Sequence, residues 1–324
     1  MLVGNLSLRI NAPRPVVLLM QPLLQSIEDG LDKAYTVHRM HQAQNCEMLL
    51  ADISTSVRGV VTGGARGISR AMMDDLPALE IIALSGIGTD AVDLDRARQR
   101  GIRVTTTPDV LTDDVADLAI GLLFAVSRRT CANDRFVRAG KWLIGGVPLA
   151  RKVTGKRLGI LGLGRVGRAV ARRAQAFDMS IAYTSAHRHE DVPFRFVPVL
   201  EDLAKESDVL VVTVSGGPRT QGIVNANVLT ALGPGGILIN VARGSVVDEE
   251  ALVFALLEGR LGGAGLDVFA DEPRVPESLC RLDNVVLQPH QGSATVETRM
   301  AMGELILANL AAHFSGEPLL TPVI

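Results

Sequence analysis

Three residues of the types that carry acid–base chemistry stand in the last third of the sequence: Arg243, Glu272 and His290. Each lies at or just beyond the end of an apolar segment that is typical of a buried strand. Ligands of open α/β sheets bind outside the carboxyl ends of the strands. We therefore expect these three side chains to lie at one edge of a sheet.

Taken singly, these residues also have ordinary interpretations. A lone histidine is more often a surface or satisfied core residue than a catalytic one, and an Arg–Glu pair is more often a structural ion pair. His187 and His189 invite a metal-site interpretation, but no third ligand accompanies them at a helical or turn spacing, so we expect a solvated loop and no metal. A choice between these interpretations needs further motifs.

The segment Arg157–Gly167 contains such a motif, Gly162-x-Gly164-x-x-Gly167, between an apolar strand and a predicted helix. Gly162 permits the tight turn, Gly164 lets a pyrophosphate approach the backbone, and Gly167 allows close packing of helix on strand. The helix N-terminus then offers free N–H groups to the phosphates. A glycine turn without a ligand is the alternative, and the strand–turn–helix context favours a dinucleotide site.

The residue that reads the adenine ribose is expected about 20 residues after the first glycine, where NAD sites carry an acid. The stretch Tyr183-Thr-Ser-Ala-His-Arg188 offers no acid before Glu190. It offers donors instead: Ser185, His187 and Arg188 suit the 2′-phosphate of NADP(H). We predict that NADP(H) is preferred, with NAD(H) as the alternative cofactor.

Short β-branched runs alternate with helical patterns along most of the 324 residues, which is typical of parallel α/β sheets. The predicted helices are 112–129, 165–177, 249–258 and 295–314. The predicted strands are 16–20, 59–62, 80–84, 103–106, 157–161, 180–183, 209–213, 236–241, 265–269 and 285–288. A first lobe ends near Pro108, and the second contains the glycine motif.

Composition narrows the class further. Hydrophobic residues make up 47% and aromatic residues 3%, so the cores must be aliphatic. A net charge of −2 without a basic cluster gives no reason to expect a nucleic-acid partner. The cysteines, at 46, 131 and 280, are isolated, which favours a reducing compartment. The uncharged run 220–242 contains Pro and Gly and is interpreted as helix, turn and strand, not as a membrane helix. Residues 1–15 lack the pattern of a signal peptide, so we expect a soluble, cytoplasmic protein with no membrane partner.

From about Val57 to the C-terminus, the chain resembles the D-isomer-specific 2-hydroxyacid dehydrogenase family, and most of all its glyoxylate/hydroxypyruvate reductase branch. Five motifs occur in the family's order. They are Ser85-Gly-Ile-Gly-Thr-Asp90 with the crossover that follows it, the glycine motif, and the three segments around Arg243, Glu272 and His290.

The resemblance implies two Rossmann-like or flavodoxin-like doubly wound parallel-sheet domains with an active-site cleft between them. It implies a substrate-binding (catalytic) domain at 1–108, completed by the C-terminal helix at 296–324, and a dinucleotide-binding Rossmann domain at 109–295. It also implies a homodimer. The expected reaction is the NAD(P)H-dependent reduction of a small 2-oxo acid, such as glyoxylate or hydroxypyruvate, to a D-2-hydroxy acid by hydride transfer.

The roles implied for single residues follow from their chemistry. Arg243 binds the substrate carboxylate and polarises the 2-oxo oxygen, His290 donates or accepts the proton, and Glu272 favours the imidazolium. Ile87, Gly88 and Ser293 complete the substrate site, the first two through backbone N–H groups. Asp267 contacts the nicotinamide carboxamide. The other expected cofactor contacts are Thr112, Arg165, Val166, Val214, Ser215, Thr220, Val241 and Ala242.

The chain departs from the family pattern at some points. Some hydroxypyruvate reductases of this branch carry two tryptophans in the segment 140–146; Trp142 matches the first, and Gly145 stands at the second position. We therefore expect a more open pocket, which leaves the choice of 2-oxo acid open. We expect no regulatory domain of the kind found in many phosphoglycerate dehydrogenases.

Two other functions were weighed on this fold. Formate dehydrogenases pair their histidine with glutamine, and this chain has Glu272, which argues against formate. A non-enzymatic, dinucleotide-sensing corepressor remains the alternative from another class, because such proteins keep the Arg/Glu/His set. They carry extra interaction segments, and none is obvious in this sequence.

Overall fold

The computed structural model describes residues 13–324. The chain divides into two compact units: one contains the residues up to Pro108 together with Arg299–Ile324, and the other contains Asp109–Thr298. The sequence-based expectations for residues 1–12, on a signal peptide and on the start of the first domain, lie outside the described residues. Among residues 13–324, no helix is both long enough and apolar enough to cross a bilayer.

The first unit is built on a five-stranded parallel sheet. Its order is β2-β1-β3-β4-β5, the order of flavodoxin-like folds. The strands are β1 (Val16–Leu19), β2 (Thr36–Arg39), β3 (Val57–Gly63), β4 (Ile81–Ser85) and β5 (Arg103–Thr105). The inner strands are rich in Val, Ile and Leu because both of their faces are covered.

Alternate side chains of β1 show the two cores of this sheet. Leu18 packs into the layer of α2 (Cys46–Ile53), α3 (Arg70–Asp74) and α4 (Leu94–Gln99). Val17 and Leu19 face α1 (Gln25–Ala34) and α12 (Val296–Ser315), where Ile306 and Leu310 of α12 are fully buried. This period-two alternation is the geometry of an extended strand. The C-terminal helix is therefore part of the core of the first unit.

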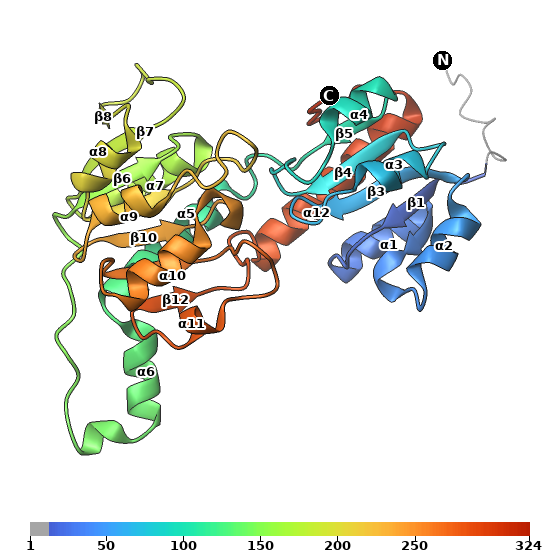
Figure 1. Cartoon of the computed structure of the whole chain (residues 1–324). Helices are drawn as coiled ribbons and strands as arrows, with labels where there is room; N and C mark the ends of the chain where they lie inside the picture. The colour runs from blue at the N-terminus through green and yellow to red at the C-terminus, as the bar shows by residue number, and fades with distance from the viewer. Residues whose placement is uncertain (1–12) are drawn as a thin grey trace, which may run out of the picture. The chain divides into compact units, whose positions relative to one another are not determined.

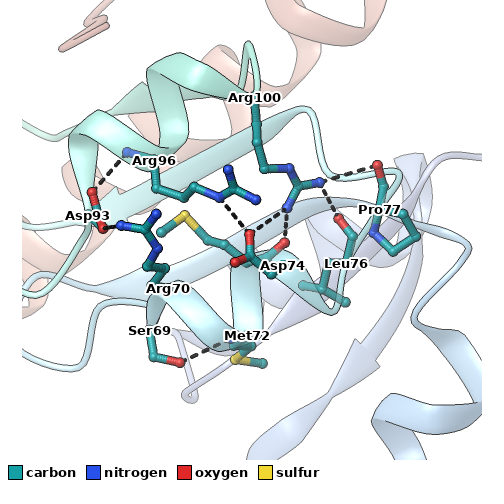
Figure 2. Close-up of polar contacts among 10 residues, drawn as sticks. Ser69, Arg70, Met72, Asp74, Leu76, Pro77, Asp93, Arg96 and Arg100 are labelled. Carbon is teal, nitrogen blue, oxygen red and sulfur yellow. Dashed lines mark hydrogen bonds and ion pairs between the residues drawn. The ribbon is translucent and has the colours of Figure 1, made fainter.

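Helices α3 and α4 are joined by ion pairs, as Figure 2 shows. Asp74 at the end of α3 accepts from Nε of Arg96 at 2.7 Å, and Arg70 contacts Asp93, the N-cap of α4, at 3.2 Å. Arg100 donates to the carbonyl oxygens of Leu76 and Pro77. These contacts fix the two ends of the connection from α3 through β4 to α4, which contains the loop 86–92.

The second unit carries a seven-stranded parallel sheet in the order β12-β11-β10-β9-β6-β7-β8. Numbered from β6, the order is that of the Rossmann fold with one further strand. The strands are β6 (Arg157–Leu161), β7 (Ser180–Thr184), β8 (Arg195–Phe196), β9 (Val209–Val212), β10 (Ile237–Asn240), β11 (Gly263–Leu266) and β12 (Val285–Leu287). The order reverses between β6 and β9, and ligands of such sheets bind at that point.

Helices cover both faces of this sheet (Figure 1). On one face lie α5 (Thr112–Ser127) and α7 (Arg165–Gln175). Helix α5 packs closely on β11 at Gly265, where an added Cβ would lie 2.9 Å from the Cβ of Leu122. The other face packs against α8 (Leu200–Lys205), α9 (Ala226–Leu232), α10 (Glu249–Leu257) and α11 (Glu277–Cys280). After α5, the chain forms an arm of α6 (Thr130–Arg138) and the 3₁₀ turn η2 (Lys141–Leu143), and this arm projects from the second unit in Figure 1.

The predicted fold class is confirmed, and the elements differ from prediction in detail. The uncharged run 220–242 forms α9, a turn and β10, as expected. The predicted strand 265–269 was wrong in its bounds, because β11 ends at Leu266 and the apolar residues Val268 and Phe269 are buried in the loop that follows. The strands β2 and β8 were missed, since both lie at a sheet edge and carry polar residues.

Candidate active site

Three neighbouring strands of the second unit end in the residues singled out by their chemistry. Arg243 follows β10, Glu272 follows β11 and His290 follows β12. These strands are adjacent and parallel, so the three loops meet at one edge of the sheet. The sequence-based expectation of a shared sheet edge is therefore met.

His290 and Glu272 form the central contact of this edge. Nδ1 of His290 lies 2.7 Å from Oε2 of Glu272, while the backbone N–H of Phe269 donates to Oε1 of the same carboxylate at 3.1 Å. The carboxylate is thus held by its own loop and orients the imidazole. Because Nδ1 faces an acceptor, Nε2 is the ring atom left for proton exchange with a substrate.

The charge state of Glu272 follows from its surroundings. Burial acts to raise the pKa of Glu272, but the hydrogen bond and charge of His290, the Phe269 N–H and the charge of Arg243 together lower that pKa below its ordinary value. The carboxylate is therefore ionised at neutral pH. An ionised carboxylate beside an imidazole favours the protonated ring.

Asp267 holds the turn that carries His290. Its carboxylate oxygens accept from the backbone N–H groups of Gln291 at 2.6 Å and Gly292 at 2.8 Å, and its carbonyl oxygen accepts from the N–H of His290 at 2.9 Å. Burial raises the pKa of Asp267, and the two backbone donors act against that rise. His290 has a φ of +55°, a conformation that the surrounding turn must hold. The predicted contact of Asp267 with a nicotinamide carboxamide stays a prediction.

Arg243 lies in a loop fixed by a buried asparagine. Asn240, at the end of β10, accepts from the N–H of Ala242 and donates to the carbonyl of Arg243 at 3.0 Å. The next residue, Gly244, lies against the loop after β11: a Cβ there would come within 1.9 Å of the Phe269 backbone. This approach requires glycine, and it brings the loops of Arg243 and Glu272 together.

The glycine motif folds as predicted, between β6 and α7. Gly162 has a φ of +98°, and a Cβ on Gly167 would lie 2.1 Å from the Gly162 carbonyl, so both positions require glycine. A Cβ on Gly164, by contrast, would meet nothing within 4 Å. The open space at Gly164, beside the N-terminus of α7, fits a bound pyrophosphate. The turn therefore has room for a dinucleotide, and the predicted contacts of these glycines with it stay predictions.

The other residues expected to contact the cofactor mostly lie at the same edge. Val214 packs against Gly162, Thr220 donates to the carbonyl of Ser215 at 2.7 Å, and Arg165 pairs with Asp109 at 2.6 Å. Val166 lies in the first turn of α7, and Val241 and Ala242 are buried after β10. Thr112, at the start of α5, has a buried hydroxyl oxygen with no hydrogen-bond partner among the described residues. Such an orphaned group fits a site that a ligand completes.

The residues expected at the 2′-phosphate lie on the loop after β7. The Ser185 hydroxyl donates to the carbonyl of His187, and His187 is exposed. Arg188 contacts Glu190, with 3.1 Å between Nε and Oε1, and both side chains are more than half exposed. Among residues 13–324, no group of three or more His, Cys, Asp or Glu side chains is arranged to hold a metal ion.

The remaining substrate residues divide between the two units. Ser293 is half-buried, in the turn after His290. Ile87 and Gly88 belong to the first unit, in the half-buried loop after β4. Thr107 fixes the start of that loop: its Oγ1 accepts from the N–H of Gly86 at 2.9 Å, and its N–H donates to the Gly86 carbonyl at 2.9 Å. The substrate contacts of Ser293, Ile87 and Gly88 stay predictions.

Sequence reasoning missed the supporting residues. Asn240 was not singled out, although an amide at the end of an apolar strand is a usable signal. Thr107 lies in the crossover that follows Ser85–Asp90, and it was not singled out either. The pairing of Arg168 with Asp191 gave no signal, because the partners are 23 positions apart and exposed.

Comparison with known proteins agrees with this geometry. Residues 120–292 match the model of the D-isomer specific 2-hydroxyacid dehydrogenase NAD-binding domain. The chain is 51% identical to hydroxyphenylpyruvate reductase of Plectranthus scutellarioides over 95% of this chain and 98% of that protein. It is 50% identical to glyoxylate/hydroxypyruvate reductase A of Arabidopsis thaliana, over the same shares of each chain.

The fold of this chain also resembles that of a solved structure. The NADPH-dependent glyoxylate/hydroxypyruvate reductase of Sinorhizobium meliloti, in complex with NADP and malonate, superposes with a TM-score of 0.90 at 45% identity. The alignment covers 96% of this chain and 97% of that chain. The similarity thus spans both units, including the sheet edge described above.

Proposed function

We propose that this chain, which belongs to the D-isomer specific 2-hydroxyacid dehydrogenase family, reduces small 2-oxo acids to D-2-hydroxy acids with NADPH. The observation that carries the proposal is the 2.7 Å contact between Nδ1 of His290 and Glu272, beside Arg243 at the same sheet edge. Glyoxylate and hydroxypyruvate are the first substrates to test.

Each residue of the edge has a step in the proposed reaction. Arg243 binds the substrate carboxylate with its planar fork and stabilises the charge that develops on the 2-oxo oxygen. His290 delivers a proton to that oxygen from Nε2, and Glu272 orients the ring through its contact with Nδ1. The nicotinamide, when bound, supplies the hydride. In the oxidation direction, His290 accepts the proton.

The cofactor preference rests on the loop after β7. That loop presents Ser185 and Arg188, and its first acidic side chain, Glu190, pairs with Arg188 at 3.1 Å. A 2′-phosphate offers Arg188 a stronger, doubly charged partner in exchange. The reductase of Sinorhizobium meliloti binds NADP on a similar fold, which supports the same preference for this chain. NAD(H) is the alternative cofactor.

The range of substrates is proposed at the level of a class. One relative acts on hydroxyphenylpyruvate and another on glyoxylate and hydroxypyruvate, so the shared chemistry is a carboxylate next to a carbonyl. That pair of groups is what Arg243 and His290 recognise. The group beyond the carbonyl is therefore the variable part of the substrate.

We also propose that the chain forms a homodimer through the arm α6–η2 and the segment that follows. The side chains of Leu143, Ile144 and Leu149 are 92%, 88% and 98% exposed, and Trp142 is 71% exposed. A contiguous group of exposed apolar side chains marks an interaction surface. A second copy of this chain fits the homodimer that the sequence predicts, and the cytoplasm is the proposed compartment.

The proposal is tested with the purified chain and a panel of 2-oxo acids, each with NADPH and with NADH. We expect turnover of glyoxylate or hydroxypyruvate with NADPH, and a chiral assay should identify the D-enantiomer when the product is chiral. The corepressor alternative predicts cofactor binding without turnover of any member of the panel. Formation of the L-enantiomer would contradict the proposed geometry.

A further inference from the structure

One arginine of α7 binds the loop after β7 at two of its residues. Arg168 donates from Nη1 to Oδ2 of Asp191 at 2.7 Å and from Nη2 to Oδ1 at 3.0 Å. Its Nη2 also lies 3.2 Å from Nδ1 of His189. A guanidinium has donors alone, so Nδ1 of His189 is the acceptor in this contact. The loop is thereby tied to the helix that begins at the glycine motif.

A second anchor comes from the strand before the loop. Tyr183 of β7 is fully buried, and its hydroxyl accepts from the backbone N–H of His189 at 2.8 Å. Its ring centroid lies 5.8 Å from that of the His189 imidazole. Arg168 thus holds the side chain of His189, and Tyr183 holds its backbone.

The anchored residues alternate with exposed ones. His189 is half-buried, whereas the side chains of Arg188 and Glu190 on either side of it are 66% and 80% exposed. The Ser185 hydroxyl closes the start of the loop by donating to the His187 carbonyl. The backbone from Ser185 to Asp191 is therefore fixed at several points, while the Arg188 side chain stays exposed and pairs with Glu190 of the same loop.

We propose that Arg168 is a positioning residue for cofactor selectivity, because it preforms the loop 185–191 that presents Ser185 and Arg188 to the 2′-phosphate of NADPH. A preformed loop saves the ordering cost that binding would otherwise include. NADH has no 2′-phosphate and gains little from that loop. The inference rests on the proposed cofactor preference, and it adds a residue that does not itself touch the cofactor.

The test measures the affinities for NADPH and for NADH separately, by calorimetry without substrate. Arg168→Ala should weaken NADPH binding about fivefold to tenfold and NADH binding less than about twofold, because residues in contact are energetically coupled. Asp191→Asn removes the negative charge that Arg168 binds, and it should also weaken NADPH binding more than NADH binding. Tyr183→Phe removes the hydroxyl that accepts from the His189 N–H, and it should lower the NADPH affinity more than the NADH affinity.

Two variants serve as controls. Arg172→Ala removes a 69% exposed arginine from the same helix, which pairs with Asp113 of α5, and should leave the NADPH to NADH affinity ratio unchanged. Arg168→Lys keeps the charge but loses the two-pronged contact, and should give an intermediate ratio. If Arg168→Ala does not fold, as judged by its melting curve, Arg168→Lys and Asp191→Asn decide the question.

Equal losses for both cofactors, or an unchanged ratio, would overturn the positioning role. A wild-type chain that binds NADPH but reduces no 2-oxo acid would refute the proposed reaction, and the affinity ratio would still decide the inference. A wild-type chain that prefers NADH would overturn both the cofactor preference and the role of Arg168.

Discussion

The backbone N–H of His290 donates to the carbonyl oxygen of Asp267 at 2.9 Å, and the next two N–H groups donate to the carboxylate of the same aspartate. A single buried side chain thus sets the path of the turn that carries the proposed proton donor. The positive φ of His290 is held by these contacts. Position, as well as charge, is therefore built into the site.

Asp267→Asn is expected to lower kcat. An asparagine keeps one carbonyl oxygen and replaces the second acceptor with an NH₂ group, which would face the N–H of Gln291 or Gly292. The turn must then move, and a displacement of about 1 Å at a catalytic group costs on the order of a hundredfold. Steady-state kinetics check the loss, with Asp271→Asn as the exposed control. A rate close to that of the wild type would show that the turn keeps its conformation without the Asp267 carboxylate.

Gly164→Ala and Gly167→Ala should separate cofactor binding from folding. An alanine at 164 meets nothing within 4 Å, so the fold should survive while the methyl group blocks the pyrophosphate, with a loss of about tenfold in NADPH affinity. An alanine at 167 would overlap the Gly162 carbonyl and should cost about 1–3 kcal/mol of stability. Melting curves and calorimetry distinguish the two. Identical behaviour of the variants would contradict the assigned roles.

Glu272→Gln should change the pH dependence of reduction. Although burial acts to raise the pKa of Glu272, its contacts with His290 lower that pKa below the ordinary value, so the carboxylate is ionised through the neutral range. Glutamine carries no charge, so the loss of activity relative to the wild type should be largest where Glu272 is ionised. That loss should shrink as the pH falls through the lowered pKa of Glu272, and kcat measured across the pH range checks it. An unchanged pH dependence of reduction would show that the charge of Glu272 plays no part in the proton transfer.

The exposed arm is expected to carry the dimer. Leu143 and Leu149 are 92% and 98% exposed, so a Leu143→Glu/Leu149→Glu double variant should fold normally as a protomer. It should sediment as a monomer if the arm lies in a subunit interface, because charge is disfavoured in an interface core. Leu257→Glu, at an exposed leucine of α10, is the matched control. Dimers of unchanged stability in the double variant would place the interface elsewhere.

Sequence patterns predicted the parts of the fold that depend on local order. The bounds of β6 and the start of α7 are as predicted, because an apolar strand, a glycine turn and an amphipathic helix each leave a local signature. Arg243, Glu272 and His290 could be placed at a sheet edge for the same reason. The edge strand β2 could not be predicted, since its polar residues, such as the exposed Thr36 and the half-buried His38, carry no hydrophobic period.

Contacts that depend on tertiary structure were beyond the sequence. The link from Arg168 to Asp191 and the hold of Asp267 on Gly292 join positions 23 and 25 residues apart, and neither spacing is a recurring motif. The projecting arm was also not predicted, because leucines are usually buried, whereas Leu143 and Leu149 are 92% and 98% exposed. The sequence did not reveal which residues these side chains contact.

The central claim is that His290 transfers the proton, and a single variant tests it most directly. His290→Asn suits the position because asparagine tolerates the positive φ found there. NADPH-dependent reduction of the preferred 2-oxo acid should fall by at least about a hundredfold, because general acid catalysis contributes 10²–10⁴-fold. NADPH affinity, measured by calorimetry on the same sample, should be unchanged. Retention of more than about a tenth of the wild-type turnover, with intact cofactor binding, would contradict the account.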